Sequence, residues 1–262
     1  MPETRKMKAK IALMGEGGVG KTSLVRRFVR NEYDDKYLQT VGTKVSKVEL
    51  TVSHGDIDVL VDLSVFDIMG QRGFKDMIKE TYFHGCQGFL AVCDVTRIET
   101  IAAVHDWMAS ATGVAGDVPA YLLVNKSDLL EKSREIPASE VEKVSETWQM
   151  QFVYTSAKTG AGVDDAFCNL AYSMVDEALR QTKAHAVEED LRHKILVIVA
   201  KRGHLGVAKQ DFFAALKGIS YSDLERELTV LERESLIAIN WKGPADFTVE
   251  ITPLGEKATK GV

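Results

Sequence analysis

The chain has 262 residues, of which 45% are hydrophobic and 27% charged, and its formal net charge is −5. This balance is typical of a globular protein with sizeable cores and leaves room for two domains of unequal size. No apolar run approaches the roughly 18 residues that span a bilayer, and the negative charge argues against a nucleic-acid-binding protein as a whole. Three cysteines form neither a disulfide framework nor a metal cluster, so we expect core positions in a reducing, cytoplasmic compartment: Cys86, Cys93 and Cys168.

Residues 1–183 alternate between strand-like and helix-like segments. This alternation predicts an α/β fold in which a mostly parallel six-stranded sheet carries helices on both faces. A turn signal at residues 53–56 joins the second and third strands, which we expect to form an antiparallel hairpin at one edge. The expected strands are Ile11–Met14, Val45–Val52, Val59–Phe66, Phe89–Val92, Ala120–Val124 and Phe152–Tyr154, and the expected helices are Thr22–Arg30, Phe74–His84, Glu99–Ala109, Ser139–Gln149 and Val163–Lys183.

A glycine-rich loop, GEGGVGKT, follows the first expected strand directly. Glycines let several backbone N–H groups turn inward toward a phosphate without a Cβ clash, and the helix that begins near Lys21 directs its positive dipole end to the same place. We expect Lys21 to neutralise β- and γ-phosphate oxygens and Thr22 to bind Mg²⁺. The residues of this phosphate loop expected to hold a nucleotide are Gly15, Gly17, Gly18, Val19, Gly20, Lys21, Thr22 and Ser23.

The same glycines also match G-x-G-x-x-G, a fingerprint of dinucleotide-binding proteins. The Lys-Thr pair that follows favours a triphosphate loop instead. Residues 31–40 are polar where a dinucleotide-binding fold has a second buried strand that ends in an acidic residue. A glycine-rich turn without a ligand is the remaining alternative. The loop therefore predicts a nucleoside triphosphate but does not specify its base.

The base is predicted by the motif NKSD at the end of the fifth expected strand. The carboxylate of Asp128 can accept two hydrogen bonds from the guanine ring N–H and amino group, a donor pair that adenine lacks. The stem of Lys126 can cover the face of the base, while Asn125 can tie loops together. After the last strand, backbone N–H groups of a further element could reach the guanine oxygen: Ser156, Ala157 and Lys158.

Residues that sense the γ-phosphate are expected in the segment DIMGQ after the third strand. Asp67 can hold Mg²⁺ through a water, and the Gly70 N–H can bond the γ-phosphate. Gln71 can orient the attacking water, so we expect it to act in catalysis together with the charge of Lys21. Upstream, Thr40 can supply a second hydroxyl ligand for Mg²⁺. The expected metal ligands are Thr22, Thr40 and Asp67.

The motifs GEGGVGKTSL, YLQTVGT, FDIMGQ, VNKSD and TSAKTG occur in this order and resemble those of the Ras superfamily of small GTPases, closest to its Rab-like branch. The resemblance covers about residues 8–183. It implies a P-loop GTPase fold and a molecular switch that binds GTP or GDP and hydrolyses GTP with Mg²⁺. It also implies that Tyr33 packs edge-on against guanine and that Tyr37 folds over the phosphates.

The chain departs from the family pattern near the third strand. Ile68 and Met69 stand where the family usually has Thr-Ala, which predicts a stiffer or more apolar second switch segment. Arg72 stands where the family usually has an acidic residue after the glutamine, so the resemblance does not extend to recognition by standard exchange factors. Gly17 keeps the small residue that leaves space for the water and an external arginine. The sequence suggests no arginine finger of its own and hence slow turnover, while Met69 leaves a nucleotide-binding scaffold without turnover as an alternative.

The last part of the chain has a different character. A short polar segment, residues 184–189, is expected to link a GTPase domain at 1–183 to a second domain at 190–262. The second segment resembles a small α+β winged helix-turn-helix domain. Its expected helices are Asp190–Lys201, Lys209–Leu216 and Ser222–Glu234, its wing strands are Leu236–Trp241 and Phe247–Ile251, and its core stripe is Leu224, Leu228, Leu231, Leu236 and Ile237.

The partners of the second domain are expected to be proteins rather than DNA. Residues 188–262 contain 11 Lys and Arg against 12 Asp and Glu, and the expected recognition helix is acidic, which disfavours contact with phosphates. A module for dimerisation or for regulatory and effector proteins is therefore favoured over a nucleotide-regulated transcription factor, although Lys201, Arg202, Lys209 and Lys217 keep the second open. No cysteine follows Cys168, so no C-terminal lipid anchor is expected.

Overall fold

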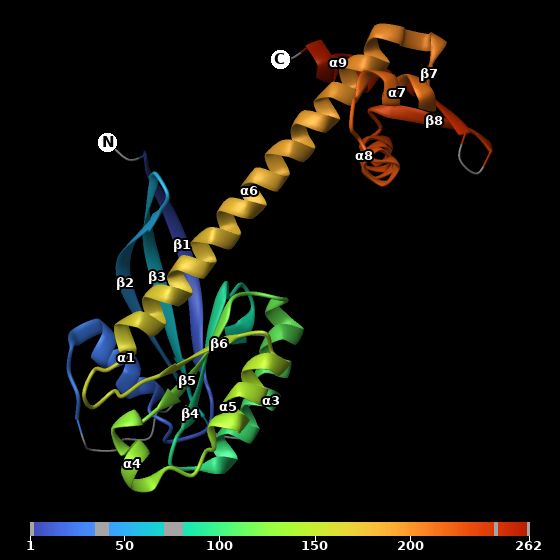
Figure 1. Cartoon of the computed structure of the whole chain (residues 1–262). Coiled ribbons are helices and arrows are strands. Elements are labelled where there is room, and N and C mark those ends of the chain that lie inside the picture. The colour runs from blue at the N-terminus through green and yellow to red at the C-terminus, as the bar shows by residue number, and fades with distance from the viewer. Residues whose placement is uncertain (1–2, 35–41, 71–80, 244–245, 261–262) are drawn as a thin grey trace. The chain divides into compact units, whose positions relative to one another are not determined.

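The computed structural model describes residues 3–34, 42–70, 81–243 and 246–260. The chain divides into two compact units, Met1–Ala178 and Leu179–Val262 (Figure 1). The first unit is an α/β fold on a six-stranded sheet, and the second is a small α+β unit with a three-stranded sheet. Within the described residues, no helix has the length and apolar character needed to cross a membrane.

The six-stranded sheet of the first unit has the order β2-β3-β1-β4-β5-β6. The edge strand β2 pairs with β3 in antiparallel fashion, and the other pairs are parallel, so the predicted hairpin is confirmed. The elements are β1 (Glu3–Met14), α1 (Lys21–Arg30), β2 (Thr43–His54), β3 (Ile57–Ile68), β4 (Gly88–Asp94), α3 (Ile98–Ala115), β5 (Ala120–Asn125), the 3₁₀ helix η2 (Ser127–Leu129), α4 (Leu130–Ser133), α5 (Ala138–Thr147), β6 (Gln151–Tyr154) and α6 (Val163–Arg202). The expected helix Phe74–His84 lies largely outside the described residues.

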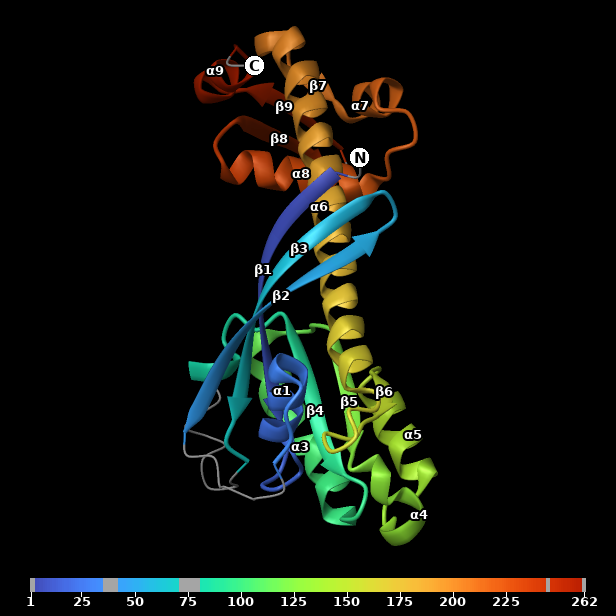
Figure 2. The same cartoon turned by 90° about the vertical axis from the view of Figure 1, so that its left-hand side faces the viewer.

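Helices cover both faces of this sheet (Figures 1 and 2). Buried side chains of α3 and α5, including Trp107 and Val141, pack against one face. On the other face, Phe28 of α1 stacks on Phe167 of α6 with ring centroids 4.0 Å apart. The parallel strands β1, β3, β4 and β5 end at the same edge of the sheet, where ligands bind in open α/β folds.

Strand β1 is longer than its apolar run predicts. The sequence indicates a strand only at Ile11–Met14, but β1 begins at Glu3. Residues Glu3–Leu13 pair with β3, whereas only Ile11–Met14 also pair with β4. The backbone hydrogen bonds to β3 extend the strand through polar residues, because a ladder needs no apolar side chains where the sheet is open to water.

The second unit contains a three-stranded antiparallel sheet with the order β7-β9-β8. Leu224, Leu228, Leu231 and Ile237 lie in its buried core, as predicted, and Leu236 is partly buried against it. The two-residue strand β7 has no sequence signal of its own, because its pairing with β9 is non-local. The elements after α6 are the 3₁₀ helix η3 (Gly203–Leu205), β7 (Val207–Ala208), α7 (Lys209–Ala215), α8 (Tyr221–Arg233), β8 (Ile237–Gly243), β9 (Asp246–Ile251) and α9 (Pro253–Lys260).

Helix α6 runs from Val163 to Arg202 and includes residues 184–189, which the sequence analysis expects to be a linker. The segment is therefore helical rather than irregular. Between Val163 and Arg202 there is no Gly or Pro that would end a helix. Ion pairs one turn apart, such as Lys194 with Asp190 at 2.5 Å, add support in the polar stretch.

Two of the three cysteines occupy core positions. Cys86 and Cys93 are buried, but Cys168 is exposed on α6, so the expectation for Cys168 is wrong. Its neighbour Phe167 is the residue that faces the sheet, and the helical period turns Cys168 outward.

Candidate functional site

The phosphate loop lies between β1 and α1 and depends on glycine at particular positions. Gly15, Gly18 and Gly20 have φ values of 139°, 76° and 102°, which side chains rarely adopt. A Cβ on Gly15 would lie 2.2 Å from the Val92 carbonyl oxygen, and one on Gly20 would lie 2.3 Å from Nδ2 of Asn125. The loop is thus packed closely against β4 and against the end of β5.

Lys21 begins α1 and is buried within this loop. Its Nζ donates hydrogen bonds to the carbonyl oxygens of Gly15 and Glu16, each at 2.8 Å. Burial lowers the pKa of Lys21 to about 8, opposed by the negative charges of Asp67 and Glu16 and assisted by the positive charge of Arg97. A buried ammonium group held by two carbonyls is suited to pair with an anion.

Thr22 and Asp67 meet beside the loop. The Thr22 hydroxyl donates a hydrogen bond of 2.5 Å to Oδ2 of Asp67. Burial raises the pKa of Asp67, while the hydrogen bond from Thr22 and the charge of Lys21 oppose the shift. The second oxygen, Oδ1, is buried and accepts no hydrogen bond from the described residues. A hydroxyl beside a carboxylate with a free buried oxygen fits Mg²⁺, which prefers oxygen ligands and few protein groups.

Gly70 packs directly against the phosphate loop. A Cβ at this position would lie 2.5 Å from the carbonyl carbon and oxygen of Glu16. From the other side, a Cβ on Gly17 would lie 3.7 Å from the Gly70 carbonyl oxygen. The segment that is expected to sense the γ-phosphate therefore begins in contact with the loop that is expected to hold it.

Asn125, at the end of β5, connects three loops. Its Nδ2 donates to the Val19 carbonyl oxygen at 2.8 Å. Its Oδ1 accepts hydrogen bonds from the Thr155 hydroxyl at 3.2 Å and from the Ala157 backbone N–H at 3.3 Å. The tie between loops that the sequence predicts for Asn125 is present, and the Ala157 N–H, expected to face the base, is engaged by this side chain.

Asp128 lies next to the loop that follows β6. The Ser156 hydroxyl donates to Oδ1 of Asp128 at 2.6 Å, which fixes the carboxylate. Arg27 of α1 secures the same loop, because its guanidinium donates to the carbonyl oxygens of Ala157 at 2.9 Å and Lys158 at 2.8 Å. The residues expected to read the base thus lie together at the same edge of the sheet as the phosphate loop.

Comparison with known families agrees with this arrangement. The model of the Ras family matches residues 10–176, which is more than half of the chain. The chain belongs to the Ras family.

Curated relatives support a Rab-related position within the family. The chain is 33% identical over 165 residues to "Ras-related protein Rab-13" of Rattus norvegicus, a match that covers 62% of this chain and 77% of the relative. It is 32% identical over 164 residues to the protein of the same name from Bos taurus, with the same coverage. This Ras-family small GTPase is therefore a GTP-binding switch protein, and its similarity to the Rab proteins is distant.

Two side chains near the site of this Ras-family protein escape the sequence analysis. Asp94 ends β4, is fully buried, and accepts a 2.5 Å hydrogen bond from Lys126 and a 2.7 Å bond from the Thr96 hydroxyl. Burial would raise the pKa of Asp94, but the hydrogen bonds from Lys126 and Thr96 outweigh it and lower the pKa. Arg97 also bonds Asp94, at 3.2 Å. The available signal was a lone acidic residue at the end of an apolar strand.

The remaining expected residues lie in α1, after it, or outside the described residues. Ser23 lies in the first turn of α1, and Tyr33 is exposed after the end of that helix. Three expected residues lie outside the described residues, so their roles stay predictions: Tyr37, Thr40 and Gln71. Arg72 lies outside them as well.

Proposed function

We propose that this Ras-family GTPase binds Mg²⁺·GTP with Lys21, Thr22 and Asp67 and hydrolyses it to GDP and phosphate. The observation that carries the proposal is the meeting of the Thr22 hydroxyl with Asp67, whose Oδ1 is buried without a partner among the described residues, beside the buried Lys21. Bound Mg²⁺ would neutralise the charge that develops on the phosphates. Lys21 and the loop amides would hold those phosphates in line for attack.

The base is proposed to be guanine, read by Asp128. Ser156 occupies one oxygen of this carboxylate, which orients the group before a base arrives. Asp128→Asn should weaken GTP binding and favour xanthosine triphosphate, because the amide offers a donor where guanine also has a donor. Equilibrium binding of GTP, ATP and xanthosine triphosphate to both proteins tests this. An unchanged preference in the variant would remove Asp128 as the base-reading residue.

Hydrolysis is proposed to use a water oriented by Gln71. We expect slow intrinsic turnover, on the order of 10⁻⁴–10⁻² s⁻¹, as in related enzymes that act without an arginine from a partner protein. Gln71→Leu should reduce single-turnover hydrolysis and leave GTP affinity largely intact. If the variant hydrolyses GTP at the wild-type rate, Gln71 has no such role.

The decisive experiment measures nucleotide retention and phosphate release on the full-length protein, with GTP and ATP side by side and with Mg²⁺ or EDTA. We expect retention of guanine nucleotides, Mg²⁺-dependent phosphate release from GTP and little from ATP. Retention without release would favour a nucleotide-binding scaffold. Equal retention of both nucleotides would contradict the proposal as a whole.

For the C-terminal region we propose a winged helix-turn-helix module, residues 190–262, that contacts proteins. The order of α7, α8 and the β8–β9 hairpin, with β7 pairing to β9, supports the winged helix. In α8 the guanidinium of Arg226 lies within 3.6 Å of oxygens of Glu188, Asp223 and Glu227, so its charge is already compensated. This leaves an acidic helix surface that fits a basic protein partner better than a phosphate backbone.

The competing function, nucleotide-regulated DNA binding, has a direct test. Binding of the full-length protein to duplex DNA is measured with GTP or GDP at increasing salt. Affinity that falls with salt and differs between the two nucleotides would favour a transcription factor. We expect no such binding.

A further inference from the structure

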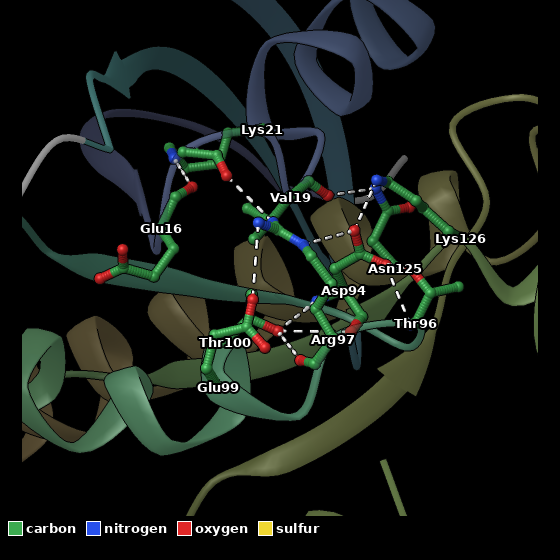
Figure 3. Close-up of polar contacts among 11 residues, drawn as sticks. Glu16, Val19, Lys21, Asp94, Thr96, Arg97, Glu99, Thr100, Asn125 and Lys126 are labelled. Carbon is green, nitrogen blue, oxygen red and sulfur yellow. Dashed lines mark hydrogen bonds and ion pairs between the residues drawn. The ribbon is translucent and has the colours of Figure 1, made fainter. Parts of the chain in front are cut away.

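Arg97 connects the phosphate loop to the guanine-reading motif through one buried carboxylate. Its Nε donates to Oδ2 of Asp94 at 3.2 Å, and its Nη2 donates to the Gly17 carbonyl oxygen at 3.0 Å. Lys126, a residue of the NKSD motif, binds the same Oδ2 from another side. Figure 3 shows Arg97 and Lys126 converging on Asp94 between the two loops.

The backbone of Arg97 is held as firmly as its side chain. Arg97 precedes α3, and its N–H donates to the Asp94 carbonyl oxygen at 2.9 Å in a tight turn. Its own carbonyl oxygen accepts a 2.6 Å hydrogen bond from the hydroxyl of Thr100, which is buried. The guanidinium therefore starts from a fixed point, and little freedom is lost when it bonds the loop.

The contact with Gly17 fixes a peptide plane of the phosphate loop. None of the described peptide bonds is cis, so the N–H of Gly18 points opposite to the Gly17 carbonyl in the planar peptide between them. Arg97 holds that carbonyl, whereas the preceding carbonyls, of Gly15 and Glu16, are held by Lys21. The two cations thus bind successive carbonyl oxygens of the loop. The bond from Arg97 fixes the orientation of the peptide that carries the Gly18 N–H.

We propose that Arg97 is a positioning residue for GTP hydrolysis, which orients the Gly17–Gly18 peptide for the phosphates and is itself held by Asp94, the carboxylate that also binds Lys126. This inference rests on the proposed function, because it needs GTP to be the substrate. Gly17 lies next to the Gly70 carbonyl, so the oriented peptide borders the segment expected to sense the γ-phosphate. A change in the orientation of the Gly17–Gly18 peptide therefore disturbs the alignment of the phosphates and not the recognition of the base.

A merely structural role for Arg97 is disfavoured by its surroundings. The side chain is 36% exposed, so its removal opens no core cavity. Asp94 keeps its bonds from Lys126 and from the N–H and hydroxyl of Thr96 when Arg97 is absent, so the buried carboxylate does not lose all compensation. Variants at position 97 should therefore fold.

The test compares Arg97→Met and Arg97→Lys with a matched control, Arg134→Met. Arg134 also donates to a backbone carbonyl, that of Ile136 at 2.6 Å, but its partners lie outside the phosphate loop. Single-turnover hydrolysis is measured on full-length protein preloaded with saturating GTP, together with the preference for GTP over ATP and the thermal midpoint. Saturation separates the chemical step from binding.

We expect Arg97→Met to slow single-turnover hydrolysis roughly ten- to a hundredfold, the range caused by small misplacements of reacting groups, with unchanged base preference. Arg97→Lys should recover part of the rate, because one ammonium group cannot span Asp94 and Gly17 as the guanidinium fork does. Arg134→Met should hydrolyse at the wild-type rate.

Three results would overturn the inference. These are wild-type hydrolysis by Arg97→Met, equal losses in Arg97→Met and Arg134→Met, and a loss in Arg97→Met that is matched by a fall in the thermal midpoint. Failure of the wild-type protein to retain GTP or release phosphate would instead refute the proposed function itself.

Discussion

Two buried carboxylates, one from each unit of this protein, have their charge compensated differently. In the second unit, Glu227 of α8 is 1% exposed and both of its oxygens are bonded, Oε2 by Arg192 at 2.6 Å and Oε1 by Arg226 at 3.0 Å. In the first unit, Asp67 is also 1% exposed, yet only Oδ2 is bonded, by Thr22. Its Oδ1 is buried without a hydrogen bond among the described residues.

The difference separates a structural charge from a functional one. A buried carboxylate with complete hydrogen bonding ties α6 to α8 and leaves nothing for a ligand. A half-bonded one costs free energy in the unliganded protein, and a cation can recover that cost. Burial raises the pKa of Asp67, while the hydrogen bond from Thr22 and the charge of Lys21 oppose the shift, and this rise has the same physical origin as the missing hydrogen bond.

The largest effect is expected from Lys21→Met. Among the described residues, the ammonium group of Lys21 donates hydrogen bonds to carbonyl oxygens and not to carboxylates, so its charge is available to phosphates. Two hydrogen bonds to phosphate oxygens, each contributing roughly 1.5–3 kcal/mol, would be lost, so affinity for GTP should fall at least about a hundredfold. Equilibrium titration with a fluorescent GTP analogue measures it. Affinity within a factor of a few of wild type would show that the charge in this loop serves structure alone.

The next largest effect is expected from Arg192→Met, which leaves Oε2 of Glu227 buried without its partner. Breaking one side of a buried ion pair should destabilise α8 by about 3 kcal/mol. Hydrogen exchange of the α8 amides in the full-length protein reports this locally. Lys194→Met is the control, since Lys194 lies on the same helix in an exposed pair and should cost no more than about 0.5 kcal/mol. Equal hydrogen-exchange protection of the α8 amides in the two variants would contradict the structural role of the buried Glu227 pair.

A smaller and opposite effect is expected from Asp67→Asn. Because folding raises the pKa of Asp67, the ionised carboxylate lowers stability at neutral pH, and the neutral amide should raise the stability of the nucleotide-free protein. The same variant should lose Mg²⁺-dependent GTP affinity. Thermal unfolding in EDTA is compared with Glu227→Gln, which should be destabilising. Two shifts of the same sign would contradict the distinction between the carboxylates.

The smallest effect is a pH dependence of nucleotide binding. In the nucleotide-free protein the pKa of Lys21 is lowered by burial from 10.5 to about 8. Phosphates bind the protonated form, so GDP affinity should fall as pH rises above about 8, by at most about tenfold per pH unit. The stability of the nucleotide-free protein should instead rise as the pH increases from about 8 to 10.5, because the unfolded chain binds more protons than the folded protein in this range. Lys21→Arg, which stays charged, should show no such fall in affinity.

The sequence by itself predicted the parts of the site that depend on short-range patterns. A glycine loop followed by Lys21 and Thr22, and an NKSD motif after an apolar strand, have local spacing that carries their chemistry. The turn at residues 53–56 and the alternating elements determined the hairpin and the sheet class for the same reason. The roles of Thr40 and Gln71 rest on the sequence alone.

Only the tertiary structure decided which distant groups meet. Arg97 is 80 positions from Gly17, and Arg192 is 35 from Glu227, so no period or motif connects them. Non-local contacts likewise decide where β1 begins and that β7 pairs with β9. They also bring Lys126 to the carboxylate of Asp94. Hydrogen bonds and the burial of charge depend on which groups lie close in space. Groups that are distant in the sequence come close only when the helices and strands pack together.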